Sequence, residues 1–508
     1  MAVSSRLSGE GALGRWVRSA WAIPLFTAVL GLAARLYGLG GKPLWYDEVL
    51  TLKRATLPLG DLIADSFHNK HYPLYFLLTK PLATTTDWSE ATLRIPACVF
   101  GAVSVLMAAR IAHAVAGGWA ALTAGALMAL SPLEVQYGQE ARPYTLASAA
   151  ILIATWGLVR TLGTQVAPIG AAQSGQRTGW LAYGLGMAVA LNTIGAAAPC
   201  FVAINVSVLA LAGSKRLPPD WPLRTWLLTN LAVLVMWLPG LMALMVASSG
   251  DASRGLNWVP PFTLQLARTV LASLYMFQLS DLLTFERLSA PVPLLGFSVL
   301  ALAGAGGVLA MRSRLAFLLV GLAVAMPATL VLISLAKPLF VPRYLLWGTG
   351  PYFILAGIGL ASIGPVALRA AVAIAVMCGA AVSLAPYYAV EAKPRWDLAA
   401  AYLAQHSAPG DAGVVSSGLA RLMLGTYAAR TRRDALGVLE LDSRDQIMSK
   451  FARGANVWVI YGRAGQGGNL ITREMFAARW AELGPPRQSA TFGRHIVIWR
   501  HARDPASR

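Results

Sequence analysis

Long apolar segments recur along this chain and constrain its fold more than any other feature. A stretch of about 20 apolar residues is enough for a helix to cross the hydrocarbon core of a membrane, and about eleven such stretches occur before residue 392. The predicted spans are Trp16–Leu39, Leu93–Ala116, Trp119–Leu133, Tyr144–Leu162, Trp180–Ile194, Ala196–Ala212, Leu223–Ala247, Pro291–Met311, Leu315–Ala336, Tyr344–Ile363 and Val366–Tyr387. The sequence therefore predicts a polytopic α-helical membrane protein.

Composition agrees with this prediction. Only 13% of the 508 residues are charged, whereas about 25% are charged in an ordinary soluble domain. So few charges cannot cover the surface of a soluble protein of this size. The composition excludes a soluble globular enzyme, a disordered chain and a disulfide-stabilised scaffold. The three cysteines all fall within predicted spans, where we expect them to be buried.

The charges also predict an orientation. The chain carries a net charge of +19, and its basic residues before residue 392 gather in alternate turns between spans. By the positive-inside rule these turns are cytoplasmic, so we expect a cytoplasmic N-terminus and, after an odd number of spans, a periplasmic C-terminal domain at a bacterial inner membrane. Because the basic residues serve topology, we expect no nucleic-acid partner.

The acidic residues are divided even more unevenly than the basic residues between the two predicted faces of the membrane. Of the 14 Asp and Glu in residues 1–391, twelve fall on the predicted outer face. Acidic residues contribute little to membrane orientation, so topology alone does not require this distribution. A working surface at the outer face would require it.

Residues 1–391 thus form the predicted transmembrane domain, and residues 392–508 form a second domain outside the membrane. The first outer loop, residues 40–92, is amphipathic, which suits helices that lie in the membrane interface. The tail alternates helices with short strands rich in β-branched residues. This alternation predicts a small α/β domain with a mostly parallel sheet. Its strands are expected at Ala412–Ser416, Leu436–Leu441 and Val457–Tyr461, with a hairpin through Phe492–Trp499.

Two adjacent carboxylates, Asp47 and Glu48, lie a few residues after the first span and follow the aromatic pair Trp45 and Tyr46. Aromatic residues of this kind anchor at the membrane interface, so the carboxylates lie at the depth of a lipid phosphate. They are candidate catalytic residues. Alternatively, they form a solvated acidic pair that favours the positive end of a helix dipole.

Other polar side chains are expected at the same face. The candidates for binding a donor phosphate or substrate are His71, Arg94, Glu140, Arg142, Tyr144, Lys337, Arg343 and Tyr344. Carboxylates and cations on one side of an apolar body suit a substrate that carries a phosphate on a lipid tail. Arg343 has an alternative role as an interface cation beside Tyr344, and Arg94 as a cap for its span. His68 and His71 could ligate a divalent cation with Asp47 or Glu48, but we assign no metal or other cofactor.

Several of these residues belong to motifs with a family resemblance. The motifs WYDE, HYPLYFLL, SEATLRIPACVFGAVSVL, SPLEVQYGQEARPYTL and KPLFVPRYLL occur in this order, and KPRWDLAAAYL opens the tail. Together they resemble the family-39 type of GT-C glycosyltransferases, which are protein mannosyltransferase-like and aminoarabinose-transferase-like integral membrane enzymes. The resemblance covers roughly residues 20–400. Tyr72 departs from the family, which usually has a proline at this position.

The resemblance implies an activity. Such enzymes transfer a sugar from a polyprenyl-phosphate donor to a lipid, glycan or protein acceptor at the non-cytoplasmic face, usually with inversion. Asp47 matches the family's favoured base, and the matches also include His71, the segment Gln139–Tyr144, Arg343 and Tyr344. Inverting transfer needs one carboxylate to accept a proton and cations to stabilise the departing phosphate.

Two other classes of function remain as alternatives. A transporter or flippase of a lipid-linked or anionic substrate places ionisable residues at mid-membrane, commonly on broken helices within internal repeats. The predicted spans contain few ionisable residues, and we see no repeat. A non-catalytic assembly factor that presents its outer domain would leave the carboxylates of the first loop without a role.

Overall fold

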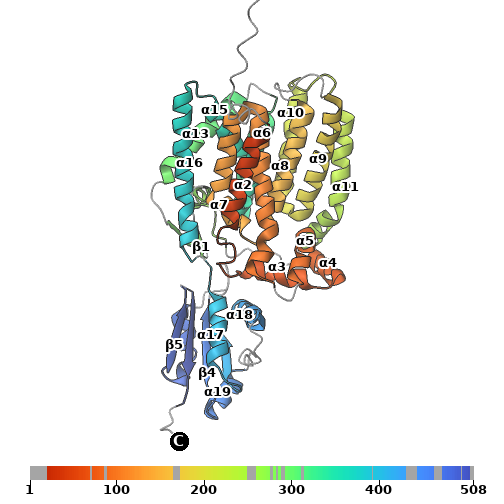
Figure 1. Cartoon of the computed structure of the whole chain (residues 1–508). Coiled ribbons are helices and arrows are strands. Elements are labelled where there is room, and N and C mark those ends of the chain that lie inside the picture. Colours follow the sequence, from red (N-terminus) through yellow and green to blue (C-terminus); the bar gives the residue numbers. More distant parts are fainter. Residues whose placement is uncertain are drawn as a thin grey trace, which may run out of the picture.

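The computed structural model describes residues 20–68, 71–84, 88–163, 172–248, 259–274, 278–281, 284–287, 292–310, 314–391, 393–430, 443–462, 472–493 and 495–503. A bundle of long helices makes up most of the molecule, and a small domain of helices and strands follows it at one end (Figure 1). The fold is therefore a polytopic α-helical membrane fold with a C-terminal α/β domain, as the sequence predicts.

Every predicted span coincides with a helical segment. The helices of the bundle are α2 (Ala22–Leu36), α6 (Glu90–Leu130), α8 (Tyr144–Leu162), α9 (Ala172–Thr193), α10 (Ala198–Gly213), α11 (Leu223–Ser248), α13 (Val292–Ala310), α14 (Ala316–Ala336), α15 (Leu346–Ala361) and α16 (Val366–Ala389). Within the described residues, seven helices are long and apolar enough to cross a membrane. The number of spans stays a prediction.

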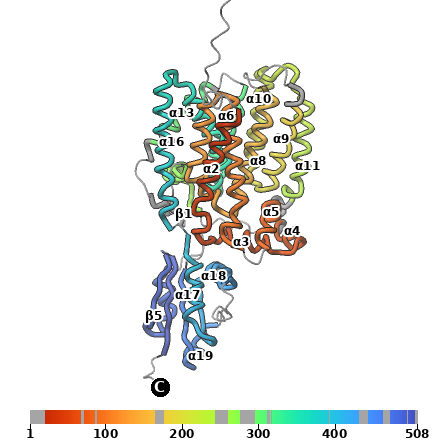
Figure 2. Tube along the Cα trace, viewed as in Figure 1, coloured from red at the N-terminus to blue at the C-terminus, as the bar shows by residue number. Residues whose placement is uncertain are grey.

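Helix α6 holds two of the predicted spans. Ala116 and Gly117 have non-helical backbone angles, and Gly117 has a φ of 79°, a conformation that glycine adopts at little steric cost. The chain reverses direction at this point, so the two helical segments of α6 are antiparallel (Figure 2). The turn brings residue 130 to the end of the bundle where α6 began.

The first outer loop forms three short helices across that end of the bundle: α3 (Tyr46–Thr56), α4 (Leu59–His68) and α5 (Leu74–Ala83). They are amphipathic as predicted: Leu62 is fully buried, whereas Leu59 is 55% exposed. Shorter elements at this end are α7 (Pro132–Gly138), η1 (Gly195–Ala197), α12 (Leu264–Ala272), the hairpin β1 (Gln278–Asp281) and β2 (Thr284–Arg287), and η3 (Pro342–Leu345).

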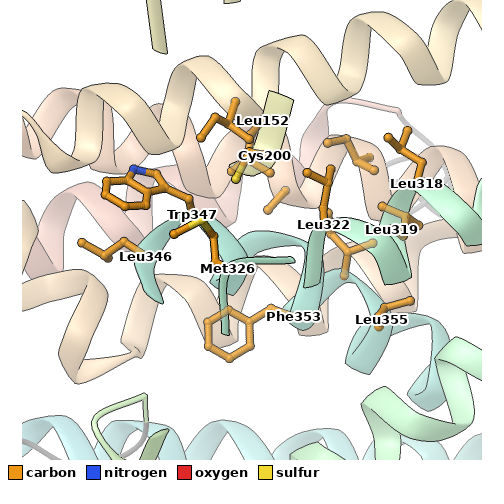
Figure 3. Packing of buried hydrophobic residues seen from close by; sticks show 14 of the residues in the cluster. Leu152, Cys200, Leu318, Leu319, Leu322, Met326, Leu346, Trp347, Phe353 and Leu355 are labelled. Carbon is orange, nitrogen blue, oxygen red and sulfur yellow. The ribbon is translucent and has the colours of Figure 1, made fainter. Parts of the chain in front are cut away.

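The core of the bundle surrounds α15. Its side chains Leu346, Trp347 and Phe353 are almost fully buried, and they pack with Leu152 of α8 and Met326 of α14 (Figure 3). This packing fixes the start of α15, and with it the short helix η3 just before. The cysteine prediction is wrong at one position: Cys98 and Cys200 are buried, but Cys378 is exposed, because it lies on the outer side of α16.

The C-terminal domain contains α17 (Trp396–His406), β3 (Ala412–Val415), α18 (Gly418–Arg430), α19 (Arg444–Ala452), β4 (Val457–Gly462), α20 (Arg473–Ala478), η5 (Ala481–Leu483), β5 (Gln488–Phe492) and β6 (Ile496–His501). The strand order is β3-β4-β6-β5. Among the described strands of this domain, only β3 and β4 pair in parallel, and β6 is antiparallel to both β4 and β5. The described sheet is therefore not mostly parallel, contrary to the prediction, because the final hairpin joins β4 directly. The strand predicted at Leu436–Leu441 lies outside the described residues.

Candidate functional site

The candidate site centres on Asp47 in the first turn of α3. This carboxylate lies beside two guanidinium groups from distant parts of the chain. Arg343 Nη1 donates a hydrogen bond to Asp47 Oδ2 over 3.3 Å, and Arg142 Nη2 lies 3.9 Å from the same oxygen. The side chain of Asp47 is 20% exposed, compared with 8% for Arg142 and 12% for Arg343. A carboxylate open to solvent thus lies between two largely buried cations.

Arg142 comes from the turn between α7 and α8. Its Nη1 donates to the backbone oxygen of Asp47 over 3.2 Å and to Thr51 Oγ1 over 3.3 Å. Its Nε atom is buried and donates no hydrogen bond within the described structure. Arg142 therefore contacts both the carboxylate and the backbone of α3.

Glu48 has a different environment from its neighbour. It is fully buried, and its carboxylate accepts hydrogen bonds from Arg94 Nε (2.7 Å), Arg94 Nη2 (2.9 Å), Lys393 Nζ (2.7 Å) and the backbone nitrogens of Trp45 (3.2 Å) and Ala141 (2.9 Å). Burial alone would raise the pKa of Glu48, but the charges of Arg94 and Lys393 hold this pKa low, at about 2. The Trp45 bond satisfies a free N–H at the helix start.

Arg94 is occupied completely within this arrangement. Besides its two bonds to Glu48, its guanidinium donates to the backbone oxygens of Leu39 (2.8 Å), Lys42 (2.8 Å) and Pro43 (2.9 Å). An arginine has five N–H donors, and all five are used here. Arg94 therefore holds the chain that leads from α2 into α3, and it has no donor left for a phosphate.

Glu140 and His71 lie at the edge of this charged group. Burial raises the pKa of Glu140 to about 7; the nearby Lys393 lowers this pKa, whereas Glu48 raises it. One carboxylate oxygen of Glu140 has no hydrogen-bond partner within the described structure. Burial lowers the pKa of His71 to about 3, and the positive charges of Arg54 and Arg142 contribute further. His71 is therefore neutral at neutral pH.

Aromatic side chains line the side of the site that faces the bundle. The guanidinium carbons of Arg142 and Arg343 lie 5.6 Å from the ring centroids of Tyr144 and Tyr344, respectively. Tyr344 stacks on Trp347 with 6.0 Å between ring centroids. Cations held over aromatic faces in this way are attracted by the ring quadrupole, so the rings help to hold both guanidiniums near Asp47.

Other predicted site residues do not join this group. Lys337 is exposed at the end of α14, and its side chain makes no ion pair with the acids that the structure describes. His68 lies at the end of α4. No three metal-ligating side chains of the described chain come together, so we assign no metal ligands.

Sequence reasoning missed Lys393 as a site residue. Its side chain is only 11% exposed, and it reaches Glu48 from the segment that joins α16 to the C-terminal domain. This segment contains the motif KPRW, which is part of the family resemblance. However, nothing in a single sequence indicates that a lysine 345 residues after Glu48 pairs with it.

Sequence comparison finds no relatives: no protein-family model and no curated protein matches the chain. Structural comparison does find relatives among solved structures. The chain is similar to ArnT from Cupriavidus metallidurans in the apo state, with a TM-score of 0.58 and 13% identity over 97% of this chain and 98% of that chain. It is also similar to the same protein bound to undecaprenyl phosphate, with a TM-score of 0.54 and 14% identity over 94% of this chain and 97% of that chain.

A third similarity is to the archaeal oligosaccharyltransferase AglB from Archaeoglobus fulgidus in complex with an inhibitory peptide and a dolichol-phosphate. The TM-score is 0.53 and the identity 12%, over 87% of this chain and 69% of that chain. The matches to ArnT extend over almost the whole of both chains, so they include the C-terminal domain. The chain therefore shares the overall fold of these membrane proteins, in agreement with the fold that its motifs predict.

Proposed function

We propose that this protein transfers a sugar from a polyprenyl-phosphate donor to an acceptor at the non-cytoplasmic face of the membrane. One observation carries the proposal: on a GT-C fold, the solvent-accessible carboxylate of Asp47 lies between Arg142 and Arg343. The lipid phosphates in the titles of two similar structures support a donor of the same chemical class. The acceptor, which is a lipid, a glycan or a protein, is left open.

In this proposal Asp47 is the base. The acceptor hydroxyl oxygen attacks the anomeric carbon of the sugar while its proton passes to a carboxylate oxygen of Asp47. The bond between the anomeric carbon and the phosphate oxygen breaks with inversion, and its electron pair leaves with the polyprenyl phosphate. A phosphate leaving group needs no general acid, so a single carboxylate suffices, in contrast to the carboxylate pair of glycoside hydrolases.

Arg343 and Arg142 stabilise the phosphate. Without substrate they contact Asp47, so a donor phosphate would compete with this carboxylate for the same guanidinium groups. Donor binding would thereby release the Asp47 carboxylate to accept a proton. Cations aimed at the charge that develops on the leaving group lower the barrier. The exposed Lys337 is a further candidate to meet the phosphate as the lipid approaches.

Glu48 and Arg94 take a different role in this proposal from the one expected of them. Glu48 is fully buried with five hydrogen bonds, so it neither reaches an acceptor nor has a lone pair free for a proton. Arg94 has no donor left. We assign both residues to holding α3, and we leave Asp47 as the sole proposed base.

A transporter is the alternative, and one observation favours it. Arg35 and Glu134 form an ion pair of 3.5 Å with no exposure of either side chain. Ionisable residues inside a membrane protein commonly mark a transport path. However, Thr349 also donates to Glu134, and the pair links α2, α7 and α15, so it suits a fixed brace better than a moving gate.

Mass spectrometry of envelope glycans and lipids tests the proposal. A deletion strain should lose a sugar modification that the parent strain has, and the wild-type gene should restore it. Asp47→Asn should fail to restore it although the protein is folded and inserted in the membrane. Asp61→Asn, which removes the same charge from an exposed position on α4, is the matched control. An unchanged glycan profile, or restoration by Asp47→Asn, would contradict the proposal.

A further inference from the structure

The C-terminal domain shares a hydrophobic core with the helix that carries Asp47. Buried apolar residues from both domains form one continuous cluster. The members from the helical bundle and its first outer loop are Leu44, Val49, Leu52, Ala55, Ala83, Leu93 and Ala141, of which Val49, Leu52 and Ala55 belong to α3. Those from the C-terminal domain include Trp396, Leu403, Met423, Leu424 and Tyr427. Inter-domain contacts within one chain are commonly polar and permit relative motion. A shared apolar core instead couples α3 to the domain.

Polar contacts fix the register of this interface. Lys393 Nζ donates to Glu48 Oε2 over 2.7 Å, and the backbone nitrogen of Leu44 donates to Tyr427 Oη over 2.6 Å. A third contact, Arg430 with Glu90 at 2.8 Å, is more exposed. Exposed pairs contribute little, so the Lys393 and Tyr427 contacts are the main polar ties between the two domains. Of these two, the Lys393 contact is the one between charged groups.

The Lys393 contact meets α3 at the turn that positions the proposed base. Glu48 follows Asp47 directly, and its other carboxylate oxygen accepts from Ala141, whose neighbour Arg142 contacts Asp47. A shift of Glu48 would therefore move Asp47 relative to Arg142. A misplacement of about 1 Å can reduce a catalysed rate by about 10²-fold.

Charge balance gives Lys393 a second effect. Two buried carboxylates, Glu48 and Glu140, lie near Lys393 and Arg94. Loss of Lys393 would leave Arg94 as the one cation that the described structure pairs with Glu48. Glu48 would keep its bonds from Arg94, Trp45 and Ala141 but lose one of the two cations that offset the cost of its burial. The start of α3 would then be held less firmly.

We propose that Lys393 is a positioning residue, through which the C-terminal domain holds the first turn of α3 and Asp47 in their working arrangement. The proposal rests on the proposed function in so far as Asp47 is the base. It assigns to the C-terminal domain a structural part in the transfer site, and it does not require this domain to contact the donor.

Hydrogen exchange of the full-length protein in detergent tests the proposal without a need for turnover. We compare wild type with Lys393→Met, which removes the charge at similar size, and with Lys393→Arg, which keeps it. Arg395→Met is the matched control, because Arg395 lies two residues away and pairs with Glu391 and Asp397 rather than with α3. Affinity for undecaprenyl phosphate and restoration of the envelope glycan in the deletion strain are measured for the same variants.

Lys393→Met should increase exchange of the backbone amides in residues 44–56 at least 10-fold, with the long helices of the bundle unchanged. Glycan restoration should fall at least 10-fold, whereas affinity for undecaprenyl phosphate should change less than about threefold. Lys393→Arg should recover most of both losses, and Arg395→Met should resemble wild type.

Three outcomes of the exchange experiment would overturn the proposal: unchanged exchange in residues 44–56, an equal effect of Arg395→Met, or increased exchange throughout the bundle, which would indicate loss of overall stability. The two proposals fail separately. If wild type restores no glycan, the proposed transfer is wrong, and the exchange data still decide whether Lys393 holds α3. If wild type restores the glycan and Lys393→Met does so equally, only the positioning role is wrong.

Discussion

The carboxylate of Asp47 and the guanidinium of Arg343 lie 3.3 Å apart although 296 residues separate them in the chain. Asp47 belongs to α3 in the first outer loop, whereas Arg343 comes from η3, just before the buried helix α15. The pair therefore joins the first outer loop to the core of the bundle, and it places the proposed base next to a cation that is proposed to bind the donor phosphate.

Arg343→Ala should weaken binding of undecaprenyl phosphate at least 10-fold, because the guanidinium supplies charge-assisted hydrogen bonds that alanine cannot replace. Tryptophan fluorescence titration in detergent measures the affinity. Arg369→Ala removes the same charge beyond α15, where Arg369 donates to the backbone oxygen of Ile363, and should leave the affinity unchanged. Equal affinities for wild type and Arg343→Ala would contradict the phosphate-binding role of Arg343 and favour its alternative role as a cation at the membrane interface.

Glu48→Ala should destabilise the protein by about 3–5 kcal/mol, because it leaves the buried cations Arg94 and Lys393 without their carboxylate. Thermal unfolding in detergent should show a clear fall in melting temperature. Glu391→Ala removes a carboxylate that is 56% exposed and pairs with Arg395, so it should cost no more than about 1 kcal/mol. Similar melting temperatures for the two variants would argue against the buried network as a source of stability.

Stability should depend on pH with opposite signs at two carboxylates. The pKa of Glu140 is raised to about 7, so the folded state holds a proton that the unfolded state releases, and this contribution to stability is lost as pH rises from about 4.5 to 7. The pKa of Glu48 is lowered to about 2, so its contribution is lost as pH falls from about 4.5 to 2.

Glu140→Gln isolates the first of these effects. The variant should show a smaller loss of melting temperature between pH 5 and pH 7.5 than wild type, while Glu391→Gln should follow wild type. Melting curves at several pH values in this range provide the measurement. If Glu140→Gln and wild type lose the same stability over this range, another group is responsible.

The Arg35–Glu134 pair should behave as a structural brace. Either Arg35→Met or Glu134→Leu alone leaves an uncompensated buried charge and should destabilise by about 3–5 kcal/mol, whereas the double variant should recover most of this loss. Melting temperatures of the two single variants and the double variant measure the coupling. If the double variant still restores the glycan, the Arg35–Glu134 pair is not needed for function. This result would also remove the observation that favours the transporter alternative.

The positions of the spans and of the interfacial loop could be predicted from the sequence because both depend on local composition. An apolar stretch of about 20 residues forms a helix wherever it lies in lipid, since its backbone must satisfy its own hydrogen bonds. The amphipathic pattern of residues 40–92 likewise predicts surface helices, and α3, α4 and α5 occur there. The order of the strands was not predictable in this way, because an antiparallel hairpin can join either edge of a small sheet.

The division of roles between Asp47 and Glu48 depended on tertiary structure. Both residues are acidic, adjacent and in the first turn of α3, so the sequence alone does not distinguish their roles. Successive residues on a helix point about 100° apart, and this rotation turns Glu48 inward to Arg94 and Lys393 while Asp47 faces Arg142 and Arg343 at the solvent edge. Those partners come from α6, the tail, the α7–α8 turn and η3, and only packing of the whole chain brings them together.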